Sequence, residues 1–337
     1  NWFMPQLRQN IVTGEWVVIA PERSKRPTDF VAAESIKPQL KADCPFCVTN
    51  ATGAYNSRRK DFETNLVYVT PNKYPAFVED TEHCSPRTYK LESAFYNARP
   101  STGGHDIIVS KDHDRSIYDF TEEIWFEMLE MARHRYIYWR QDCNTRYSML
   151  IYNQGVRAGA SIYHPHAQLF ASNIIPNQIS RELDGSLQYF NDNGSCVFCD
   201  LIAHEHAEKT RVLAETDELI VFTFYAARFP FETWVLPKKH FASFSTVKPE
   251  LVKSLAKAMK NVVGQLGKTL QNPSFNLYLH DLPTGVERAD YYHWHLEIAP
   301  RVSTYGGYEL GSGTIIDVMS PEDAAGYLRQ TSKQEER

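Results

Sequence analysis

Two short cysteine pairs constrain the fold of this chain more than any other feature. The pairs are Cys44–Cys47 and Cys196–Cys199, each of the form C-x-x-C, and they begin 152 residues apart. Each pair is followed by a histidine shortly after an apolar run, His113 or His240, and then by an H-x-H segment that begins 51 residues later in the first case and 53 in the second. The histidines are, in chain order, His113, His164 and His166, then His240, His293 and His295. This repetition predicts two diverged copies of one unit.

The hydrophobic pattern places these landmarks on strands and helices. Short apolar or β-branched runs predict strands, and two longer amphipathic stretches, 121–138 and 248–270, predict one long helix in each copy. The predicted strands are 16–20, 106–110, 148–152, 167–171, 219–224, 233–236, 275–279 and 295–298. We therefore expect an α+β fold of two tandem halves, each an antiparallel sheet with a long helix, packed together as a pseudo-dimer.

The boundaries of the halves follow from the repeat. We expect an N-terminal half at 1–172 and a C-terminal half at 195–337, joined by a connecting segment at 173–194. That segment contains Pro176 and the turn-like pair Asp184-Gly185, which predict turns between the halves.

The repeated cysteines and histidines predict two metal sites. Two thiolates and two imidazoles form a closed tetrahedral ligand set, which suits structural zinc. A thioredoxin-like redox motif is the other interpretation of a single C-x-x-C pair, but such a motif does not need a second copy. The expected zinc ligands are Cys44, Cys47, His113 and His164 in the first half, and Cys196, Cys199, His240 and His293 in the second.

Composition excludes several classes of partner. The formal net charge is −5, so no overall positive field draws the chain to nucleic acid or to an anionic membrane. No stretch approaches the roughly 18 uninterrupted apolar residues of a membrane span, and the first 21 residues contain no signal-peptide core. We therefore expect a cytoplasmic protein that binds neither nucleic acid nor membrane.

The segment 164–168, His-Pro-His-Ala-Gln, has the features of a phosphorus-transfer site. Alternate residues of an extended segment share a face, so His164, His166 and Gln168 point the same way. The loop 153–161 just upstream is rich in small residues, and its amides and a serine hydroxyl can bind phosphate oxygens. A neutral imidazole attacks phosphorus with one nitrogen while the other donates a hydrogen bond. His166 is thus the expected nucleophile, and a supporting role at the metal site is the alternative.

These residues resemble the galactose-1-phosphate uridylyltransferase family, a duplicated member of the histidine-triad superfamily. The likeness runs almost from end to end, and the His-Pro-His-x-Gln string is its most specific part. Hydrolytic relatives carry a third histidine where Gln168 stands, and the glutamine marks the transferases. The segments that carry the resemblance are 10–16, 21–27, 44–47, 111–113, 153–161, 164–168 and 307–309.

The resemblance implies ping-pong transfer in a homodimer of two histidine-triad-like halves per chain. His166 takes the uridylyl group from UDP-glucose, releases glucose 1-phosphate, and passes the group to galactose 1-phosphate. The resemblance also implies the residues that bind the nucleotide sugar and the hexose 1-phosphate. They are Arg23 and Arg26 at the nucleotide phosphates, Asn72 at the nucleoside, Asn153, Gly159, Ala160, Ser161 and Gln168 at the transferred group, and Tyr308 and Glu309 at the hexose across the dimer interface.

Other functions remain open at this point. The segment 310–316 contains the Gly-x-Gly version of the hexose region, which occurs in relatives that are ADP-glucose phosphorylases. Such an enzyme uses the same histidine and passes the nucleotidyl group to inorganic phosphate. A zinc-bearing nucleotide-binding protein without catalysis is the remaining alternative.

The metal of the second half also has an alternative. Some family members hold iron there through one glutamate and three histidines, and Glu182, His280, His293 and His295 stand in matching places. The second cysteine pair claims His293 for a zinc set that mirrors the first half. We therefore expect zinc in both halves, with iron as the alternative in the second.

Overall fold

The computed structural model of this chain describes residues 5–21, 37–47, 54–80, 95–96, 98–286 and 289–335. The strands are β1 (Gln6–Gln9), β2 (Trp16–Ile19), β3 (Val67–Pro71), β4 (Gly103–Ser110), β5 (Tyr147–Gln154), β6 (His166–Ser172), β7 (Val212–Glu215), β8 (Leu219–Thr223), β9 (Thr233–Pro237), β10 (Phe275–His280), β11 (His295–Pro300) and β12 (Ile315–Asp317). The helices are α1 (Glu122–Gln141), α2 (Asn177–Asn193), α3 (Val197–Glu208), α4 (Pro249–Leu270), α5 (Gly307–Ser312) and α6 (Pro321–Glu335). No helix in these ranges has the length and apolar character needed to cross a membrane.

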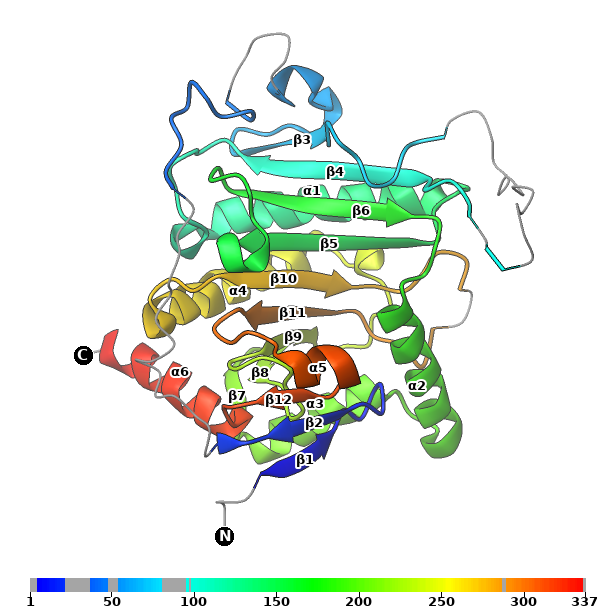
Figure 1. The fold of residues 1–337 in the computed structure, drawn as a ribbon, viewed down its shortest axis with the longest axis vertical. Helices are drawn as coiled ribbons and strands as arrows, with labels where there is room; N and C mark the ends of the chain where they lie inside the picture. The colour runs from blue at the N-terminus through cyan, green and yellow to red at the C-terminus, as the bar shows by residue number, and fades with distance from the viewer. Residues whose placement is uncertain are drawn as a thin grey trace.

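Nine strands form one continuous antiparallel sheet in the order β3-β4-β6-β5-β10-β11-β9-β8-β7 (Figure 1). The two copies meet edge to edge where β5 pairs with β10, with Asn153 opposite Asn276. The strand order on one side of this seam repeats on the other, which is the arrangement of a pseudo-dimer. Strands β1, β2 and β12 form a separate small sheet, in which β12 runs parallel to β2. The predicted α+β fold is confirmed.

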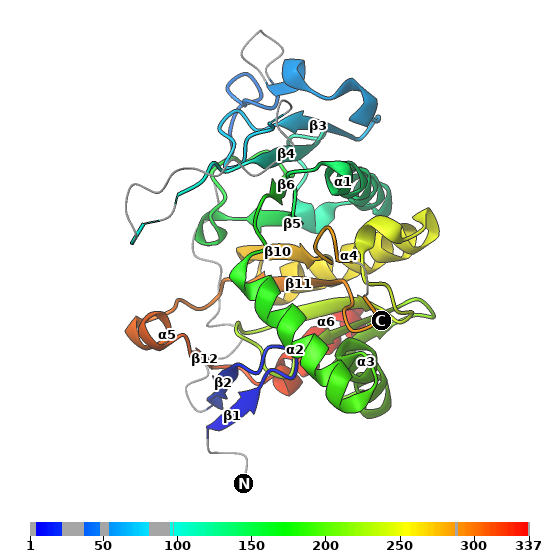
Figure 2. The same cartoon turned by 90° about the vertical axis from the view of Figure 1, so that its right-hand side faces the viewer.

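The main core lies between one face of the large sheet and the helices α1 and α4 (Figure 2). Strand β6 illustrates the alternation, because Ala167, Leu169 and Ala171 are buried in this core while the residues between them face the other way. Thr121 caps the N-terminus of helix α1, and its hydroxyl accepts a hydrogen bond from the Ile124 amide at 3.3 Å. Two long helices on one side leave the opposite face of β6 available for a site.

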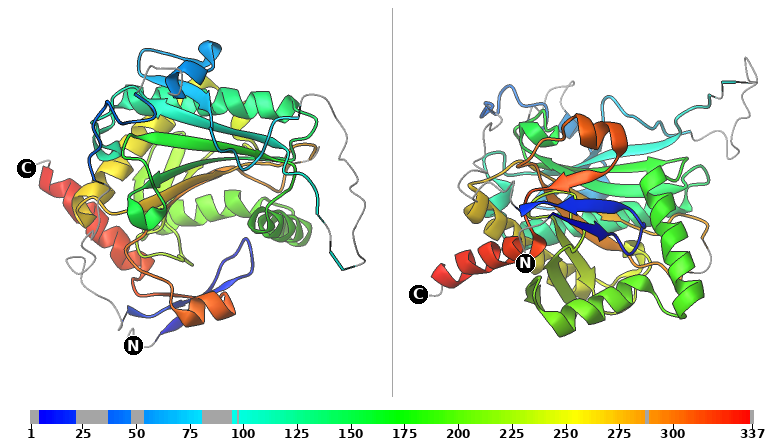
Figure 3. Two further views of the ribbon diagram at one scale, coloured as in Figure 1. Left: turned by 45° about the horizontal axis from the view of Figure 1, so that its top comes forward. Right: turned by 60° about the horizontal axis from the view of Figure 1, so that its bottom comes forward.

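The connecting segment differs from its prediction, because most of it is helix α2 rather than turns. Pro176 precedes the helix as its N-cap, and Gly194 ends it in the left-handed conformation with φ +73°. Gly185 lies inside the helix, where a Cβ would collide with the Val12 carbonyl oxygen. Its lack of a side chain therefore lets the β1–β2 hairpin approach α2 closely, and the glycine that suggested a turn serves packing instead. Figure 3 shows that the hairpin, β12 and α5 lie together on one side of the molecule.

Candidate active site and metal centres

His166 begins strand β6 and points away from the helices. Its Nδ1 lies 2.8 Å from the backbone carbonyl oxygen of His164, to which it donates. This bond places the proton on Nδ1 and leaves the lone pair on Nε2. Burial lowers the pKa of the His166 imidazole, although the hydrogen bond to the His164 carbonyl opposes this effect. The ring is therefore neutral and oriented, as a nucleophile toward phosphorus requires.

The loop after β5 is held in place mainly by glycine conformations and by one asparagine from the other half. Gly155 has φ +80°, and a Cβ there would collide with the Ser274 side chain. Asn276 Nδ2 donates both to Asn153 Oδ1 at 2.9 Å and to the Ala158 carbonyl at 2.8 Å. Strand β10 of the second half thus fixes the loop of the first. No local sequence pattern singles out Asn276, because its role depends on the pairing of β5 with β10.

The loop presents fewer backbone donors than its glycine content suggested. The amide N–H groups of Ala158 and Ala160 donate to the Gly155 carbonyl, and that of Gly159 donates to Val156. Ser161 is exposed, so its hydroxyl is the donor that the end of the loop offers to a ligand. Gly159 has φ +83°, and no atom lies within 4 Å of the position that a Cβ would take there.

Gln168 shares the open face of β6 with His166 and contacts a residue that the sequence did not single out. Its Oε1 lies 2.9 Å from Nε2 of His105 on β4. The Nδ2 atom of Asn72, the predicted nucleoside residue, lies 3.2 Å from the same ring nitrogen. Two predicted ligand-binding residues therefore meet at one buried histidine.

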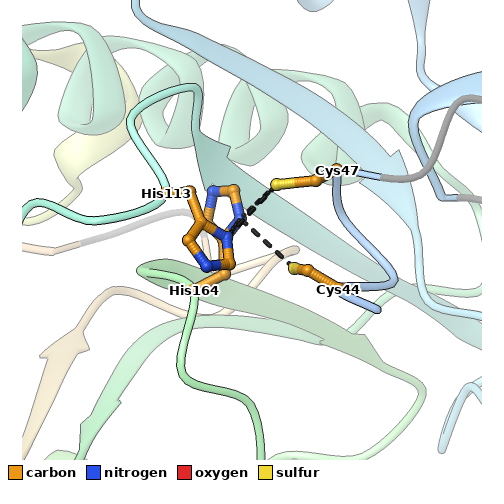
Figure 4. Close-up of side chains that lie close together, drawn as sticks. All are labelled: Cys44, Cys47, His113 and His164. Atoms are coloured by element: carbon orange, nitrogen blue, oxygen red, sulfur yellow. Dashed lines mark hydrogen bonds between the residues drawn. The ribbon is translucent and has the colours of Figure 1, made fainter. Parts of the chain in front are cut away.

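The first predicted metal set comes together (Figure 4). The distance from His164 Nδ1 is 3.4 Å to Cys44 Sγ, 3.2 Å to Cys47 Sγ and 3.1 Å to His113 Nδ1. Tetrahedral zinc with bonds of about 2.0–2.3 Å needs ligand atoms separated by little more than this. Both outer ring nitrogens are occupied, since His164 Nε2 lies 2.5 Å from the Ser110 carbonyl and His113 Nε2 lies 2.6 Å from that of Gln39. Such hydrogen bonds aim the Nδ1 atoms at a common centre.

The second predicted metal set also comes together, around the start of α3. Cys199 Sγ lies 3.3 Å from His240 Nδ1 and 3.7 Å from His293 Nδ1. His240 Nε2 lies 3.1 Å from the Ala289 carbonyl. This group, completed by Cys196, fits one small ion as the first group does.

A third group contains the residues of the iron alternative and is separate from the second. Glu182, His280 and His295 gather with Glu297, and His293 takes no part. The expectation that the two sets compete for His293 is therefore wrong, because His293 lies before β11 and groups with the second cysteine pair, whereas His295 begins β11 and groups with Glu182 and His280. The fourth member is Glu297, whose Oε2 lies 2.6 Å from an Arg228 guanidinium nitrogen.

Profile comparison identifies both halves of the chain. Residues 2–176 match the N-terminal domain of galactose-1-phosphate uridyl transferase, and residues 182–333 match its C-terminal domain. The chain belongs to the galactose-1-phosphate uridylyltransferase family. It is a nucleotidyltransferase of that family.

Members of the uridylyltransferase family with different activities resemble the chain over its whole length. An ADP-glucose phosphorylase from Arabidopsis thaliana is 31% identical over 335 residues, covering 97% of this chain and 93% of the relative. A galactose-1-phosphate uridylyltransferase from Thermotoga maritima is 26% identical over 337 residues, with 97% and 99% covered. The crystal structure of an ADP-glucose phosphorylase from A. thaliana with bound ADP-glucose has a TM-score of 0.81 at 30% identity, with 97% and 99% covered.

The two hexose residues implied by the uridylyltransferase resemblance lie on a helix apart from the strand of His166. Tyr308 and Glu309 lie on α5, which stands off the open side of the molecule (Figure 2). Tyr308 is 58% exposed, and the Glu309 carboxylate accepts from the Gly306 amide at 2.8 Å. Arg23 and Arg26 lie outside the described residues.

Two pockets adjoin the site. One, of about 210 Å³, lies at the end of the sheet and is lined by His164, Pro165 and His166. The other, of about 340 Å³, is lined by Asn276, Arg228 and other residues of the open face. Asn153 lines both, so the two pockets flank the seam between the halves.

Proposed function

We propose that this chain transfers a nucleotidyl group from a nucleotide sugar through a covalent intermediate on His166, and that it acts as an ADP-glucose phosphorylase. The observation that carries the chemistry is the bond from His166 Nδ1 to the His164 carbonyl, which leaves Nε2 as the nucleophile. The choice of nucleotide sugar rests on the 31% identity to an ADP-glucose phosphorylase and on the Gly-x-Gly segment at the end of α5.

The reaction has two displacements at one phosphorus atom. His166 Nε2 bonds to the α-phosphorus of ADP-glucose, the bond from that phosphorus to the bridging oxygen breaks, and glucose 1-phosphate leaves. An oxygen of inorganic phosphate then attacks the same phosphorus, the nitrogen–phosphorus bond breaks, and ADP leaves with the imidazole restored. Donors around the phosphorus stabilise charge on its equatorial oxygens in both steps. The Gln168 amide, the Asn153 amide and the Ser161 hydroxyl are the proposed donors.

Zinc is the proposed ion of both Cys₂His₂ sets, because thiolates with imidazoles in a closed tetrahedron suit it better than iron. His164 links the first set to catalysis. Its Nδ1 would bind the ion, while its backbone carbonyl accepts a hydrogen bond from His166 Nδ1. The four ligands would hold zinc in a structural role, and the proposed reaction uses only the chain's own side chains. In the third group the nearby Arg228 guanidinium already balances Glu297, so we do not assign iron there.

The active unit is proposed to be a homodimer. Tyr308 is exposed and Glu309 is half-buried on α5, which stands off the open side of the chain, so they would serve the hexose of a second copy. Asn72, Gly159 and Ala160 would border the nucleotide, and Arg23 and Arg26 would meet its phosphates.

Labelling His166 tests this proposal. The protein is incubated without acceptor with ADP-glucose or UDP-glucose labelled at the α-phosphate, and peptides are analysed by mass spectrometry. We expect adenylyl on the peptide containing His166, discharge of the label by inorganic phosphate, and no label in His166→Asn. His204→Asn, a change at an exposed histidine on α3, is the matched control and retains labelling. If neither sugar nucleotide formed an adduct, the proposal would fail, and the remaining interpretation would be a nucleotide-binding protein without catalysis.

Uridylyl transfer is the second candidate. The family profiles and the T. maritima relative support it, and the histidine chemistry is the same. A uridylyl adduct that galactose 1-phosphate discharges faster than inorganic phosphate would establish this activity and reject the phosphorylase.

A further inference from the structure

His105 is a buried polar residue at the centre of the open face of the first half. It lies on β4, it is 8% exposed, and its ring stacks on Phe170 with centroids 3.9 Å apart and planes at 29°. In the β4–β6 register His105 pairs with Phe170 and Ile107 pairs with Gln168. Its neighbours on the same face, Ile107 and Val109, belong to an apolar cluster. A polar ring in this position requires hydrogen-bonding partners.

The contacts of His105 determine where its proton lies. Its Nδ1 accepts from the Ala76 amide N–H at 3.4 Å, so Nδ1 carries no proton. Burial lowers the pKa of the imidazole, which keeps the ring neutral with one proton. That proton is therefore on Nε2, which donates to Gln168 Oε1 at 2.9 Å.

This bond removes an ambiguity in Gln168. A terminal amide turns readily about its last torsion, and its oxygen and nitrogen have opposite effects on a phosphate. With Oε1 held by His105, the amide nitrogen is the end that remains for a ligand. If the amide were reversed, its oxygen would face the anionic oxygens and repel them.

We propose that His105 is a positioning residue, which fixes the Gln168 amide so that its N–H groups face the transferred phosphoryl group. This inference rests on the proposed function. His105 also borders Asn72, whose Oδ1 accepts from the Tyr74 amide at 2.9 Å. In this tautomer Nε2 is a donor, so it offers no lone pair to the Asn72 amide nitrogen 3.2 Å away. The His105 ring thus lies between Asn72, the predicted nucleoside residue, and Gln168, the predicted phosphate residue.

Two substitutions separate the hydrogen bond from the packing. His105→Phe keeps a ring against Phe170 but has no donor, whereas His105→Gln places an amide N–H near the position of Nε2. The rate constant for labelling of His166 by α-labelled ADP-glucose or UDP-glucose is measured in a single turnover, together with the Kd of the sugar nucleotide. Loss of one donor to a developing oxyanion slows an enzyme by about 10²–10³, and a misdirected donor costs less. We expect His105→Phe to slow labelling by about tenfold or more with Kd within about threefold, and His105→Gln to recover much of the rate.

Repeating the change in a Gln168→Leu background tests whether His105 acts through Gln168. We expect His105→Phe to change the rate there by less than about twofold, since coupled residues are not additive. Equal slowing in both backgrounds, or a wild-type rate in His105→Phe, would overturn the inference. If His105→Phe does not fold, His105→Asn, whose amide is too short to reach Gln168, replaces it in the same cycle. A wild-type protein that acquires no label contradicts the proposed function itself, and a labelled wild type with an unaffected variant contradicts only the role of His105.

Discussion

Asp106, next to His105 on β4, provides a quantitative test of what holds the catalytic sheet on its helices. The carboxylate is fully buried and accepts three hydrogen bonds. Oδ1 accepts from Arg59 Nε at 3.0 Å, and Oδ2 accepts from Arg135 Nε at 2.8 Å and from Trp139 Nε1 at 2.9 Å. Arg135 is itself fully buried, so no water replaces the carboxylate if its charge is removed.

The substitution Asp106→Asn removes one charge and one acceptor. Breaking a buried ion pair by removing one partner costs about 3–5 kcal/mol. The asparagine oxygen can retain the two bonds on the Oδ2 side, which leaves the amide nitrogen facing Arg59. Because the Arg59 side chain is 25% exposed and also lies 3.6 Å from Glu79, it can turn away. We therefore expect a loss near the lower end, about 3 kcal/mol, and a loss near 5 kcal/mol for Asp106→Ala.

Urea unfolding, followed by fluorescence and by circular dichroism, measures these losses. Asp112→Asn is the control, since Asp112 pairs with Arg115 at 2.9 Å but both side chains are about 40% exposed. An exposed pair contributes about 0–1 kcal/mol. If Asp106→Asn cost no more than Asp112→Asn, the idea that this buried network anchors β4 to α1 would be refuted.

Three further changes test the metal centre, the loop and a buried carboxyl group. Cys44→Ser should lower the zinc content by about one ion per chain and lower the melting temperature, whereas His166→Asn should change neither, as metal analysis and calorimetry will show. Gly155→Ala should lower the melting temperature and the labelling rate more than Gly159→Ala, because both have positive φ but only Gly155 would place a Cβ against Ser274. Equal effects would contradict the packing argument. Burial raises the pKa of Asp317 well above its usual value. The stability that the Asp317 carboxyl group contributes is therefore fully present below about pH 4, the pKa in the unfolded chain. It is lost as the pH rises through the pKa in the folded protein. The melting temperature of Asp317→Asn, relative to that of the wild type, should therefore rise as the pH increases from 4 to 8. A difference in melting temperature that stays constant over this range would show that the Asp317 carboxyl group is not the cause.

The sequence predicted those features that repeat or alternate within a short segment. The C-x-x-C pairs are local, and the alternation of β6 puts His166 and Gln168 on one face without knowledge of the partner strands. The second histidine of each metal set was found because the repeat duplicated its spacing. These features needed no knowledge of which strands pair.

The residues that were missed depend on pairing between distant strands. His105 meets Gln168 only through the register of β4 with β6, and Asn276 meets Asn153 only through that of β5 with β10. A register shift of one residue would send each side chain to the opposite face, and a single sequence does not define the register of distant strands. Helix α2 was missed for a related reason, since its glycine has a purpose only when the β1–β2 hairpin lies against it.

The two halves share a fold, but only the first carries the histidine and glutamine that the proposed nucleotidyl-histidine requires. In the second half His295 repeats the geometry of His166, with Nδ1 3.1 Å from the His293 carbonyl. The Trp234 ring stacks on it at 4.7 Å and leaves it with no exposed surface.

Glu297 replaces the glutamine, and its negative charge would repel a phosphate. The burial of His295 and the charge of Glu297 each oppose nucleotidyl transfer to His295, so removing the charge alone is not enough. We therefore predict that Glu297→Gln leaves labelling at one nucleotidyl group per chain, still on His166, when the adduct is counted by intact mass. A second adduct on His295 would show that charge alone silenced the second half, and that the covering tryptophan does not.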